Sequence, residues 1–421
     1  MKIQINNKEV ETLPGETLLE TARREGYNIP SLCYAKEAKH KSSCMVCAVR
    51  NVVTGQIFPS CTTLPVESMQ IDTESPEVIH TRTLSLELLL SDHRADCEAP
   101  CKTACPGNMD VAAMNRLYDQ NRTDEALTLL RDTLVIPATL CYICNAPCEK
   151  ICRKGDVNTS VSIREIKKKL VAATDLNKIL PPVPNGKKAA VNGSGPASLS
   201  TAYHLCQQGY AVTIYEQFES ILSPYIPADQ VPPEILRLEI EVLIRMGIQF
   251  KHTPEAPSPT GYDTIITPQP KTKQPARLVL EGHRLAVQQP PVPFNSTYNR
   301  FTEAEKAHIR QSYNSSRCLY CDCDAKAGCR LRLHATEYGI KTTRYPKSSA
   351  SEALHRQEIG RGMYFEPAKC IKCGLCVYNS ANGFTFKDRG FIMQVVLPEE
   401  NAENINEQLI ALCPTGALNQ R

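Results

Sequence analysis

The sequence predicts a multidomain α+β protein, and three observations lead to that prediction. The chain has 421 residues, which at about 150 residues a domain corresponds to roughly three domains. Nineteen of its 20 cysteines fall into tight groups along the chain. The segments around these groups change from β-rich to helical to alternating strand and helix. Such changes favour several small domains over a single sheet or a single bundle.

Charge, hydropathy and the first residues narrow the classes of function. Lys and Arg number 48 against 45 Asp and Glu, so the net charge is +3 and nucleic acid is not an expected partner. No run of 18 apolar residues occurs, so no membrane span is predicted. The N-terminal residues lack a basic stretch followed by an apolar one, and we expect a cytoplasmic protein. In that compartment clustered cysteines indicate metal ligation rather than disulfides.

Residues 1–75 are predicted to form a small β-rich domain. Residues 2–5 and 9–12 have the pattern of two strands, and residues 17–25 have helical spacing that stops at Gly26. The loop that follows carries the first cysteine group, which suits an iron–sulfur cluster or a structural zinc ion. That group consists of Cys33, Cys44, Cys47 and Cys61.

The residues around this group carry a resemblance to a known family. Residues 29–34, 43–49 and 59–61 resemble the [2Fe–2S] domain of the large iron–sulfur subunit of complex I and of related hydrogenases and formate dehydrogenases. The resemblance implies a β-grasp ferredoxin domain that holds one [2Fe–2S] cluster. A structural zinc site is the alternative.

Residues 76–180 are predicted to be helical and carry the second group of candidate ligands. Their fourfold spacing would place them on one face of a helix, and eight ligands suit two [4Fe–4S] clusters. The group consists of His93, Cys97, Cys101 and Cys105, followed by Cys141, Cys144, Cys148 and Cys152.

This helical region resembles the N-terminal domain of the glutamate synthase small subunit and of dihydropyrimidine dehydrogenase. The resemblance lies in residues 101–106, 146–152 and 161–164, and in that family two [4Fe–4S] clusters are held crosswise by two cysteine runs. It implies the following division. One cluster takes Cys97, Cys101 and Cys152, and the other takes Cys105, Cys144 and Cys148.

The sequence departs from that family at the fourth ligand of each cluster. The first cysteine of the family motif is absent, and His93 stands near its place, although a histidine on a helix surface is the alternative there. The later acidic or amide ligand aligns with Lys167, which cannot ligate while protonated. We expect Cys141 to replace it, with Glu165 as the weaker candidate.

Two further groups lie toward the C-terminus. Residues 300–345 look helical around Cys318, Cys321, Cys323 and Cys329, and we favour a [4Fe–4S] cluster over zinc because the neighbouring groups look like iron–sulfur sites. Residues 355–421 resemble a ferredoxin-like domain. We expect it to hold one [4Fe–4S] cluster rather than two, because Ser380 stands where a further cysteine would be expected. Its ligands are Cys370, Cys373, Cys376 and Cys413.

A ligand count agrees with one [2Fe–2S] and four [4Fe–4S] clusters. Five clusters with four ligands each require twenty ligands, and the nineteen grouped cysteines with His93 supply that number. Cys206 stands alone in an apolar helical stretch, where we expect it to be a small buried hydrophobic residue.

Residues 187–290, after a proline-rich linker, are predicted to be a truncated Rossmann-like α/β domain. Gly193 and Gly195 follow a strand and open a helix, and Glu216 ends the next strand, as a dinucleotide site requires. This part resembles the flavin domain of the glutamate synthase small subunit. Ser198 replaces the third small residue, and no second glycine fingerprint follows, so we expect a scaffold that has lost its FAD.

The proline-rich stretch within this domain carries a prediction of its own. Residues 254–293 hold nine of the thirty prolines, and we expect no long regular element there.

The sequence contains many candidate ligands for redox clusters and no visible pair of a catalytic nucleophile and its base. We therefore predict an electron-relay subunit of an NAD(P)H-linked complex. By resemblance it passes electrons between a flavin-containing NAD(P)H-oxidising subunit and a catalytic subunit of hydrogenase or formate dehydrogenase type. One alternative is a self-contained enzyme that uses FAD and iron–sulfur clusters. Another is a zinc-based interaction scaffold.

Overall fold

The structure is a computed structural model, and it divides into two compact units. It describes residues 1–93, 96–217, 221–222, 225–227, 229–253, 260–269, 271–287, 318–319, 321–323, 328–340, 345, 356–360, 362–398, 400–401 and 405–420. The described residues of the first unit, here the terminal unit, come from Met1–Cys97 and Cys323–Arg421. Those of the second, the central unit, come from Glu98–Ser296 and Tyr313–Asp322.

The N-terminal part of the terminal unit is a five-stranded sheet of order β2-β1-β5-β3-β4. Its strands are β1 (Lys2–Ile5), β2 (Lys8–Glu11), β3 (Ala48–Asn51), β4 (Ile57–Pro59) and β5 (Gln70–Asp72). Strands β1 and β2 pair antiparallel, as the sequence predicted, and β1 pairs parallel with β5. Helix α1 (Leu18–Arg24) starts at a capping box in which the Thr17 hydroxyl and the Glu20 carboxylate bond each other's backbone amides. This helix also confirms the sequence prediction.

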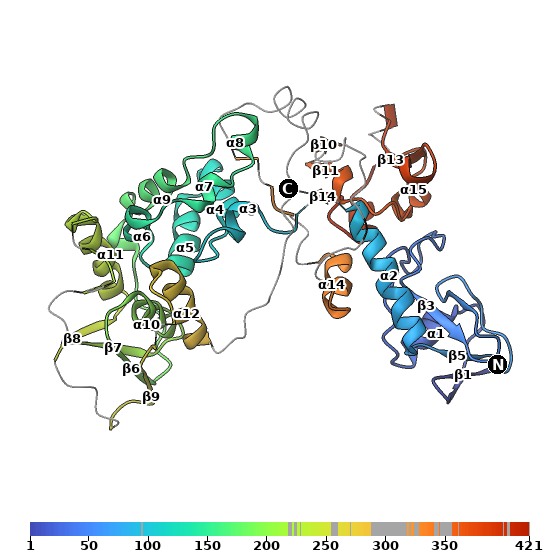
Figure 1. Ribbon diagram of the computed structural model, residues 1–421, viewed down its shortest axis with the longest axis horizontal. Helices are drawn as coiled ribbons and strands as arrows, with labels where there is room; N and C mark the ends of the chain where they lie inside the picture. Colours follow the sequence, from blue (N-terminus) through green and yellow to red (C-terminus); the bar gives the residue numbers. More distant parts are fainter. Residues whose placement is uncertain are drawn as a thin grey trace. The chain divides into compact units, whose positions relative to one another are not determined.

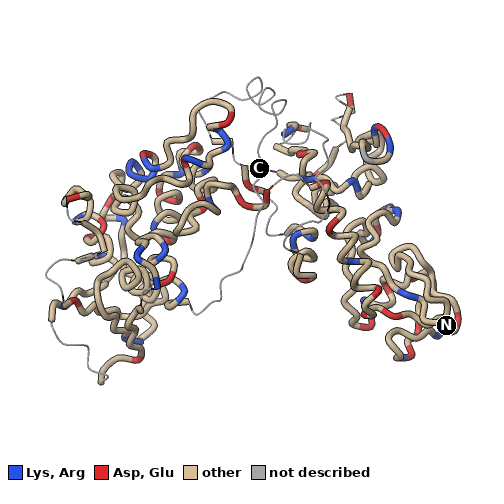
Figure 2. Tube along the Cα trace, viewed as in Figure 1, with Lys and Arg blue, Asp and Glu red and all other residues tan. Residues whose placement is uncertain are grey.

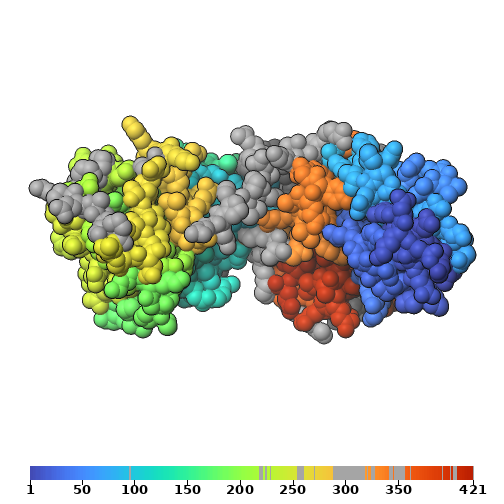
Figure 3. Space-filling model, turned by 90° about the horizontal axis from the view of Figure 1, so that it is seen from below, coloured from blue at the N-terminus to red at the C-terminus, as the bar shows by residue number. Residues whose placement is uncertain are grey.

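The rest of the terminal unit surrounds the last cysteines. Its helices are α2 (Pro76–Asp92), α14 (Arg330–Glu337), α15 (Leu375–Asn379) and α16 (Gln408–Leu412), with 3-10 turns η3 (Pro367–Lys369) and η4 (Gly390–Ile392). Its strands are β10 (Gln357–Glu358), β11 (Met363–Phe365), β12 (Thr385–Lys387), β13 (Gln394–Val396) and β14 (Leu418–Gln420). Leu32, Leu86, Leu331 and Ile371 share one apolar cluster, so the N-terminal, middle and C-terminal segments of this unit pack on one another (Figure 3).

The central unit begins with short helices, and the cysteines of the second group from Cys101 to Cys152 lie on them or in the loops between them (Figure 1). They are α3 (Pro100–Thr103), α4 (Val111–Asp119), α5 (Thr123–Leu134), α6 (Pro137–Ile143), α7 (Pro147–Lys150), α8 (Lys154–Val157) and α9 (Ile163–Ala172), followed by η1 (Leu176–Lys178). Prolines open α3, α6 and α7, where the missing amide would have no partner inside the helix. The elements agree with the helical character predicted for this stretch.

A parallel four-stranded sheet of order β8-β7-β6-β9 follows in the same unit. Its strands are β6 (Lys188–Asn192), β7 (Ala211–Glu216), β8 (Gln249–His252) and β9 (Thr264–Ile266). Its helices are α10 (Pro196–Gln207), α11 (Pro233–Arg245) and α12 (Pro275–Val287). The alternation of strand and helix predicted over residues 187–250 is confirmed.

The prediction that residues 254–293 hold no long regular element is wrong. Helix α12 occupies 13 residues of that range. Its one proline, Pro275, stands at the first helical position, where proline does not interrupt the hydrogen bonds of the helix. Gly282 lets α12 cross α10 closely, since a Cβ atom there would lie 2.1 Å from the carbonyl oxygen of Ala197. The prediction failed because it used the number of prolines and not their positions relative to the helix.

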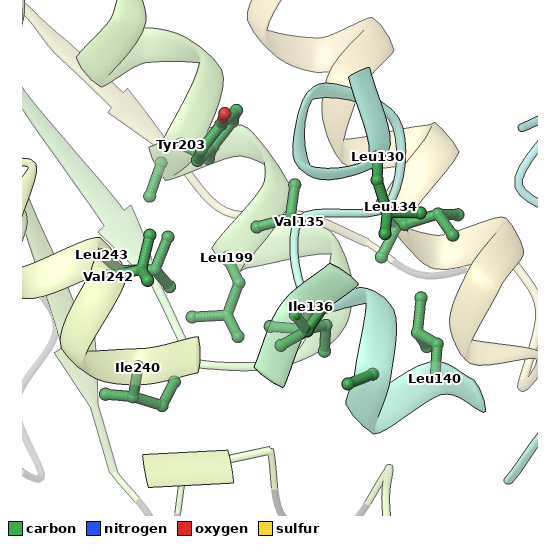
Figure 4. Close-up of a cluster of buried hydrophobic side chains, with 14 of the residues drawn as sticks. Leu130, Leu134, Val135, Ile136, Leu140, Leu199, Tyr203, Ile240, Val242 and Leu243 are labelled. Atoms are coloured by element: carbon green, nitrogen blue, oxygen red, sulfur yellow. The ribbon is translucent and has the colours of Figure 1, made fainter. Parts of the chain in front are cut away.

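One hydrophobic core joins the cysteine-bearing helices to the sheet of the central unit. Figure 4 shows Leu130 and Ile136 from the helical part beside Leu199 and Leu243 from the sheet part. All four side chains are at most 1% exposed. The two parts therefore stabilise each other through apolar burial.

Charged residues of both signs are interspersed along the chain in each unit, in keeping with the net charge of +3 (Figure 2). Among the described residues no single helix is long and apolar enough to cross a membrane; α5 and α6 together pass that test, with a bend of 66° between them.

Candidate metal centres

None of the twenty cysteines forms a disulfide in this structure. The described part of the chain contains no group of three or more His, Cys, Asp or Glu side chains with the geometry to hold a metal ion. The fold nevertheless brings predicted ligands into each other's neighbourhood, and it does so differently for each cysteine group.

The first group comes together in the N-terminal part of the terminal unit. The thiols of Cys44 and Cys61 lie close enough to Cys33 to change its pKa, and Cys61 does the same to Cys47. All four are buried, with Cys44 the most exposed at 5%. The backbone amide of Ser43 donates to Cys33 Sγ at 3.5 Å. Four buried thiols and an amide aimed at sulfur suit an iron–sulfur cluster, whose potential such bonds tune.

The fourth group lines a cavity in the terminal unit. The cavity holds about 340 Å³ of space, counting the part open to solvent, and its wall contains all four predicted ligands. Apolar residues, among them Phe365, Leu375 and Val395, complete the wall. The ligands are Cys370, Cys373, Cys376 and Cys413.

Left-handed backbone shapes the ligand loop of this cavity. Lys372 has φ 56° and Gly374 has φ 80°, and the Lys372 amide donates to Cys370 Sγ at 3.3 Å. A side chain at Gly374 would meet the Tyr378 ring at 2.6 Å. Burial raises the pKa of the Cys370 thiol to about 12, so an empty site would hold neutral thiols and a bound cation would displace their protons.

Four cysteines of the second group lie within electrostatic range of a buried lysine, Lys167. Burial alone would lower the pKa of Lys167, but negative charge on these thiols raises it. The cysteines are Cys105, Cys141, Cys148 and Cys144. Burial raises the pKa of Cys141 to about 12 and that of Cys148 to about 11. The structure thus places Cys141 with the three cysteines with which the sequence grouped it, and it places Lys167 as a cation beside them.

The other residues of the second group fall into both units. His93 ends α2 in the terminal unit and is 9% exposed, and Cys97 is the last residue of that segment. Cys101 on α3 and Cys152 after α7 lie in the central unit. Glu165 is exposed on α9. The boundary between the two units therefore falls between Cys97 and Cys101, which the family resemblance had grouped with Cys152.

The boundary between the two units also falls within the third group. Cys318 and Cys321 belong to the central unit, and Cys323 and Cys329 belong to the terminal unit. The helical character predicted for residues 301–317 and 341–344 lies outside the described residues, while residues 330–337 form α14.

The glycine loop of the parallel sheet stands where the sequence placed it. Gly193 has φ +78° between β6 and α10, and Gly195 is the residue before the first turn of α10. The ring of Tyr225 covers this turn, since a Cβ atom on Gly195 would lie 2.7 Å from Tyr225 Cε2. Ser194 is fully buried, and its hydroxyl accepts the Leu222 amide at 3.3 Å. The chain's own residues thus occupy the approach that a dinucleotide phosphate would need, and this arrangement does not fit FAD.

Glu216 ends β7 and is 5% exposed. Ser198, which replaces the third small residue, donates to the Asn192 carbonyl at 2.9 Å and so fixes the start of α10 to β6. Cys206 is buried, as predicted, and its thiol donates to the Met246 carbonyl at 3.2 Å.

Three supporting contacts escaped the sequence analysis. Glu239 on α11 accepts the Ala138 and Thr139 amides at 2.7 and 2.9 Å, and so caps the helix that carries Cys141. Burial raises the pKa of Glu239 to about 7. The other two are the Tyr225 cover and an ion pair between Arg116 and Asp322. Each joins positions far apart in sequence, so no local pattern could have revealed it.

Two family models match parts of the chain. Residues 1–76 match the 2Fe-2S iron-sulfur cluster binding domain. Residues 90–178 match domain II of dihydropyrimidine dehydrogenase, with its 4Fe-4S cluster. The chain therefore contains a [2Fe–2S] domain and a [4Fe–4S] domain, and it is a mixed α/β multidomain protein. Cys33, Cys44, Cys47 and Cys61 fall in the first match.

Relatives of known activity match about a third of the chain. The NADPH-Fe(3+) oxidoreductase subunit beta of Geobacter sulfurreducens is 32% identical over 161 residues, which are 36% of this chain and 24% of the relative. The NADP(+)-dependent formate dehydrogenase subunit beta of Moorella thermoacetica is 32% identical over 178 residues, 36% of this chain and 25% of the relative. The chain thus spans about a quarter of the length of these relatives.

One solved structure aligns along the chain. It is an NAD+-reducing [NiFe]-hydrogenase in the H2-reduced state, with a TM-score of 0.41 and 11% identity over 100% of this chain and 87% of the other.

Proposed function

We propose that the chain is a multi-cluster electron-relay subunit of an NAD(P)H-linked redox complex. The observation that carries the proposal is the gathering of buried thiols at separate places in two units, in a chain with two iron–sulfur domain matches. Iron–sulfur clusters supply one-electron transfer. The chain's own residues would hold them, exclude water from them and set the charge around them.

The cofactors proposed are one [2Fe–2S] and four [4Fe–4S] clusters. In this proposal residues 1–75 form a β-grasp domain, residues 76–180 hold two clusters, and residues 355–421 form a ferredoxin-like domain. Residues 187–290 form a truncated Rossmann-like scaffold without FAD, which the Tyr225 ring over Gly195 supports.

The partners proposed are a flavin-containing subunit that oxidises NAD(P)H and a catalytic redox subunit of hydrogenase or formate dehydrogenase type. The support is that two of the relatives are themselves beta subunits of NADPH- or NADP(+)-dependent oxidoreductases. Such a relay passes single electrons between the two partners and binds neither substrate.

Anaerobic purification of the chain alone, with iron, sulfide and flavin measured on the same sample, tests the proposal. One [2Fe–2S] and four [4Fe–4S] clusters require about 18 iron atoms per chain and no flavin. One FAD per chain with the same iron would support the self-contained enzyme instead. Zinc in place of iron, without visible absorbance, would support the interaction scaffold.

A further inference from the structure

The run Cys318, Cys321, Cys323 looks in sequence like one compact site, but the boundary between the two units passes through it. The central unit ends at Asp322 and the terminal unit resumes at Cys323. The same boundary passes between Cys97 and Glu98. Cysteines that are neighbours in sequence therefore belong to different units at two places in the chain.

We infer that the third cysteine group is not one cluster site but serves two. Cys318 and Cys321 complete a four-cysteine site with Cys101 and Cys152 in the central unit. Cys323 and Cys329 belong with His93 and Cys97 in the terminal unit. This inference rests on the proposed iron–sulfur function and assigns its ligands.

An ion pair anchors the first half of the run to the central unit. Arg116 on α4 donates to both carboxylate oxygens of Asp322, at 2.8 and 2.6 Å. Asp322 is 2% exposed, so this bidentate pair is largely removed from water, where such pairs are strong. It holds the residue after Cys321 against α4.

Helix α4 is tied in turn to the helix that carries Cys101. Asp110 caps α4 by accepting the Ala113 amide at 3.0 Å, and Lys102 of α3 reaches Asp110 at 3.4 Å. Helix α3 also packs on α7, and Cys152 follows directly after α7. Helix α4 thus links the anchored segment to α3, and α3 links it to α7.

The cysteines proposed for this site lie near one another. Cys101 is within electrostatic range of Cys321, Cys318 and Cys152, and also of Cys148. Cys321 is within the same range of Cys318 and Cys152. Each thiol of the site therefore lies within electrostatic range of others in it.

The remaining cysteines of the central unit form the second set of four. They are the thiols that act on Lys167, namely Cys105, Cys141, Cys148 and Cys144. Cys148 belongs here because it lies within electrostatic range of Lys167, Cys105 and Cys144. The eight cysteines that the cluster sites of this unit require are thus all present in it.

The second half of the run has its neighbours in the terminal unit. The Cys323 amide donates to the Cys97 carbonyl at 3.1 Å, which brings these two ligands side by side. Cys323 also lies within electrostatic range of Cys329. Cys329 shares an apolar cluster with Leu86 of α2, the helix that ends at His93.

Serine variants of the full-length chain, purified anaerobically, test the division. Their iron content and their reduced EPR spectra at graded potentials are compared with those of Cys101→Ser and Cys97→Ser. We expect Cys318→Ser and Cys321→Ser to lose the signal lost in Cys101→Ser, with about four iron atoms fewer. We expect Cys323→Ser and Cys329→Ser to lose the signal lost in Cys97→Ser. Cys206→Ser, at the ungrouped cysteine, is the matched control and should keep every signal.

Loss of one common signal in all four variants of the third group would overturn the division. A wild-type chain without iron would instead refute the proposed function. If a serine variant does not fold, Arg116→Gln retains every ligand and loosens only the anchored segment. It should weaken the Cys101 signal and spare the Cys97 signal. A spectrum unchanged in both, or altered only in the Cys97 signal, would contradict the assignment.

Discussion

At the scale of single residues, a charged side chain beside the ligands also influences the reduction potential of a cluster. Lys167 is 4% exposed and lies among four thiols of the central unit. A buried cation stabilises the more negative, reduced form of a nearby cluster. It therefore raises the reduction potential of the centre it faces.

Replacing Lys167 with Met should lower the potential of one [4Fe–4S] centre. For a unit charge about 7 Å away at an effective dielectric constant of about 20, the change is on the order of 100 mV. Potentiometric EPR titration measures it. Lys169→Met on the exposed face of the same helix is the control and should leave all potentials in place. An unchanged or higher potential in Lys167→Met would show that the lysine does not face a centre.

His204 predicts a pH dependence of stability. Its ring stacks on that of His283 at 4.1 Å, and burial lowers the pKa of His204 to about 4. The unfolded chain then binds a proton at higher pH than the folded one, so stability is lost as pH falls from about 6.5 to about 4, by roughly 3 kcal/mol in all. Hydrogen exchange of α10 amides, corrected for intrinsic rates, should show this between pH 7.5 and 5. The slope should flatten in His204→Gln, and an equal slope in both proteins would refute the assignment.

At the scale of elements, close crossings decide which residues a helix accepts. Helices α10 and α12 approach at Gly282, and the Thr201 hydroxyl donates to the Gly282 carbonyl at 3.1 Å. The crossing closes one side of the parallel sheet. It leaves no room for a methyl group, because the Ala197 carbonyl and the Ser200 side chain are already in contact with the glycine.

Gly282→Ala should therefore destabilise the central unit by about 1–3 kcal/mol, although alanine ordinarily favours a helix. The free energy of unfolding in urea measures the effect. Arg284→Ala, on the exposed side of α12, should change it by less than about 0.5 kcal/mol. Greater stability in Gly282→Ala would mean that the two helices can separate without cost.

At the scale of the whole molecule, the shared core of the central unit couples the cysteine-bearing helices to the sheet. Ile136→Ala should cost about 2–5 kcal/mol, because the side chain is fully buried in that core. Hydrogen exchange should increase in both α6 and α10, while the strands of the terminal unit keep their protection. Phe365→Ala, in the separate core around β11, should produce the opposite pattern. An increase in α6 without an increase in α10 would show that the two parts fold independently.

At this scale, some features of the molecule could be predicted from the sequence and others could not. Strands β1 and β6, helix α1 and the cavity of the C-terminal cysteines follow local patterns, and local patterns are visible in a sequence. The Arg116–Asp322 pair joins residues 206 positions apart, and the Tyr225 ring reaches Gly195 from beyond α10 and β7. Spacing within the run Cys318 to Cys323 suggested a single site, and spacing cannot show that a unit boundary falls between Asp322 and Cys323.

The hydrogen bond between the Cys323 amide and the Cys97 carbonyl has a consequence for biosynthesis. The segment between them, about 225 residues, must be translated before the terminal unit can close, which at about 5–20 residues per second takes roughly 10 to 45 seconds. During that interval the nascent chain exposes thiols whose partners do not yet exist. Ribosome-bound chains stopped at residue 322 should therefore alkylate at Cys97, whereas completed chains should be protected there.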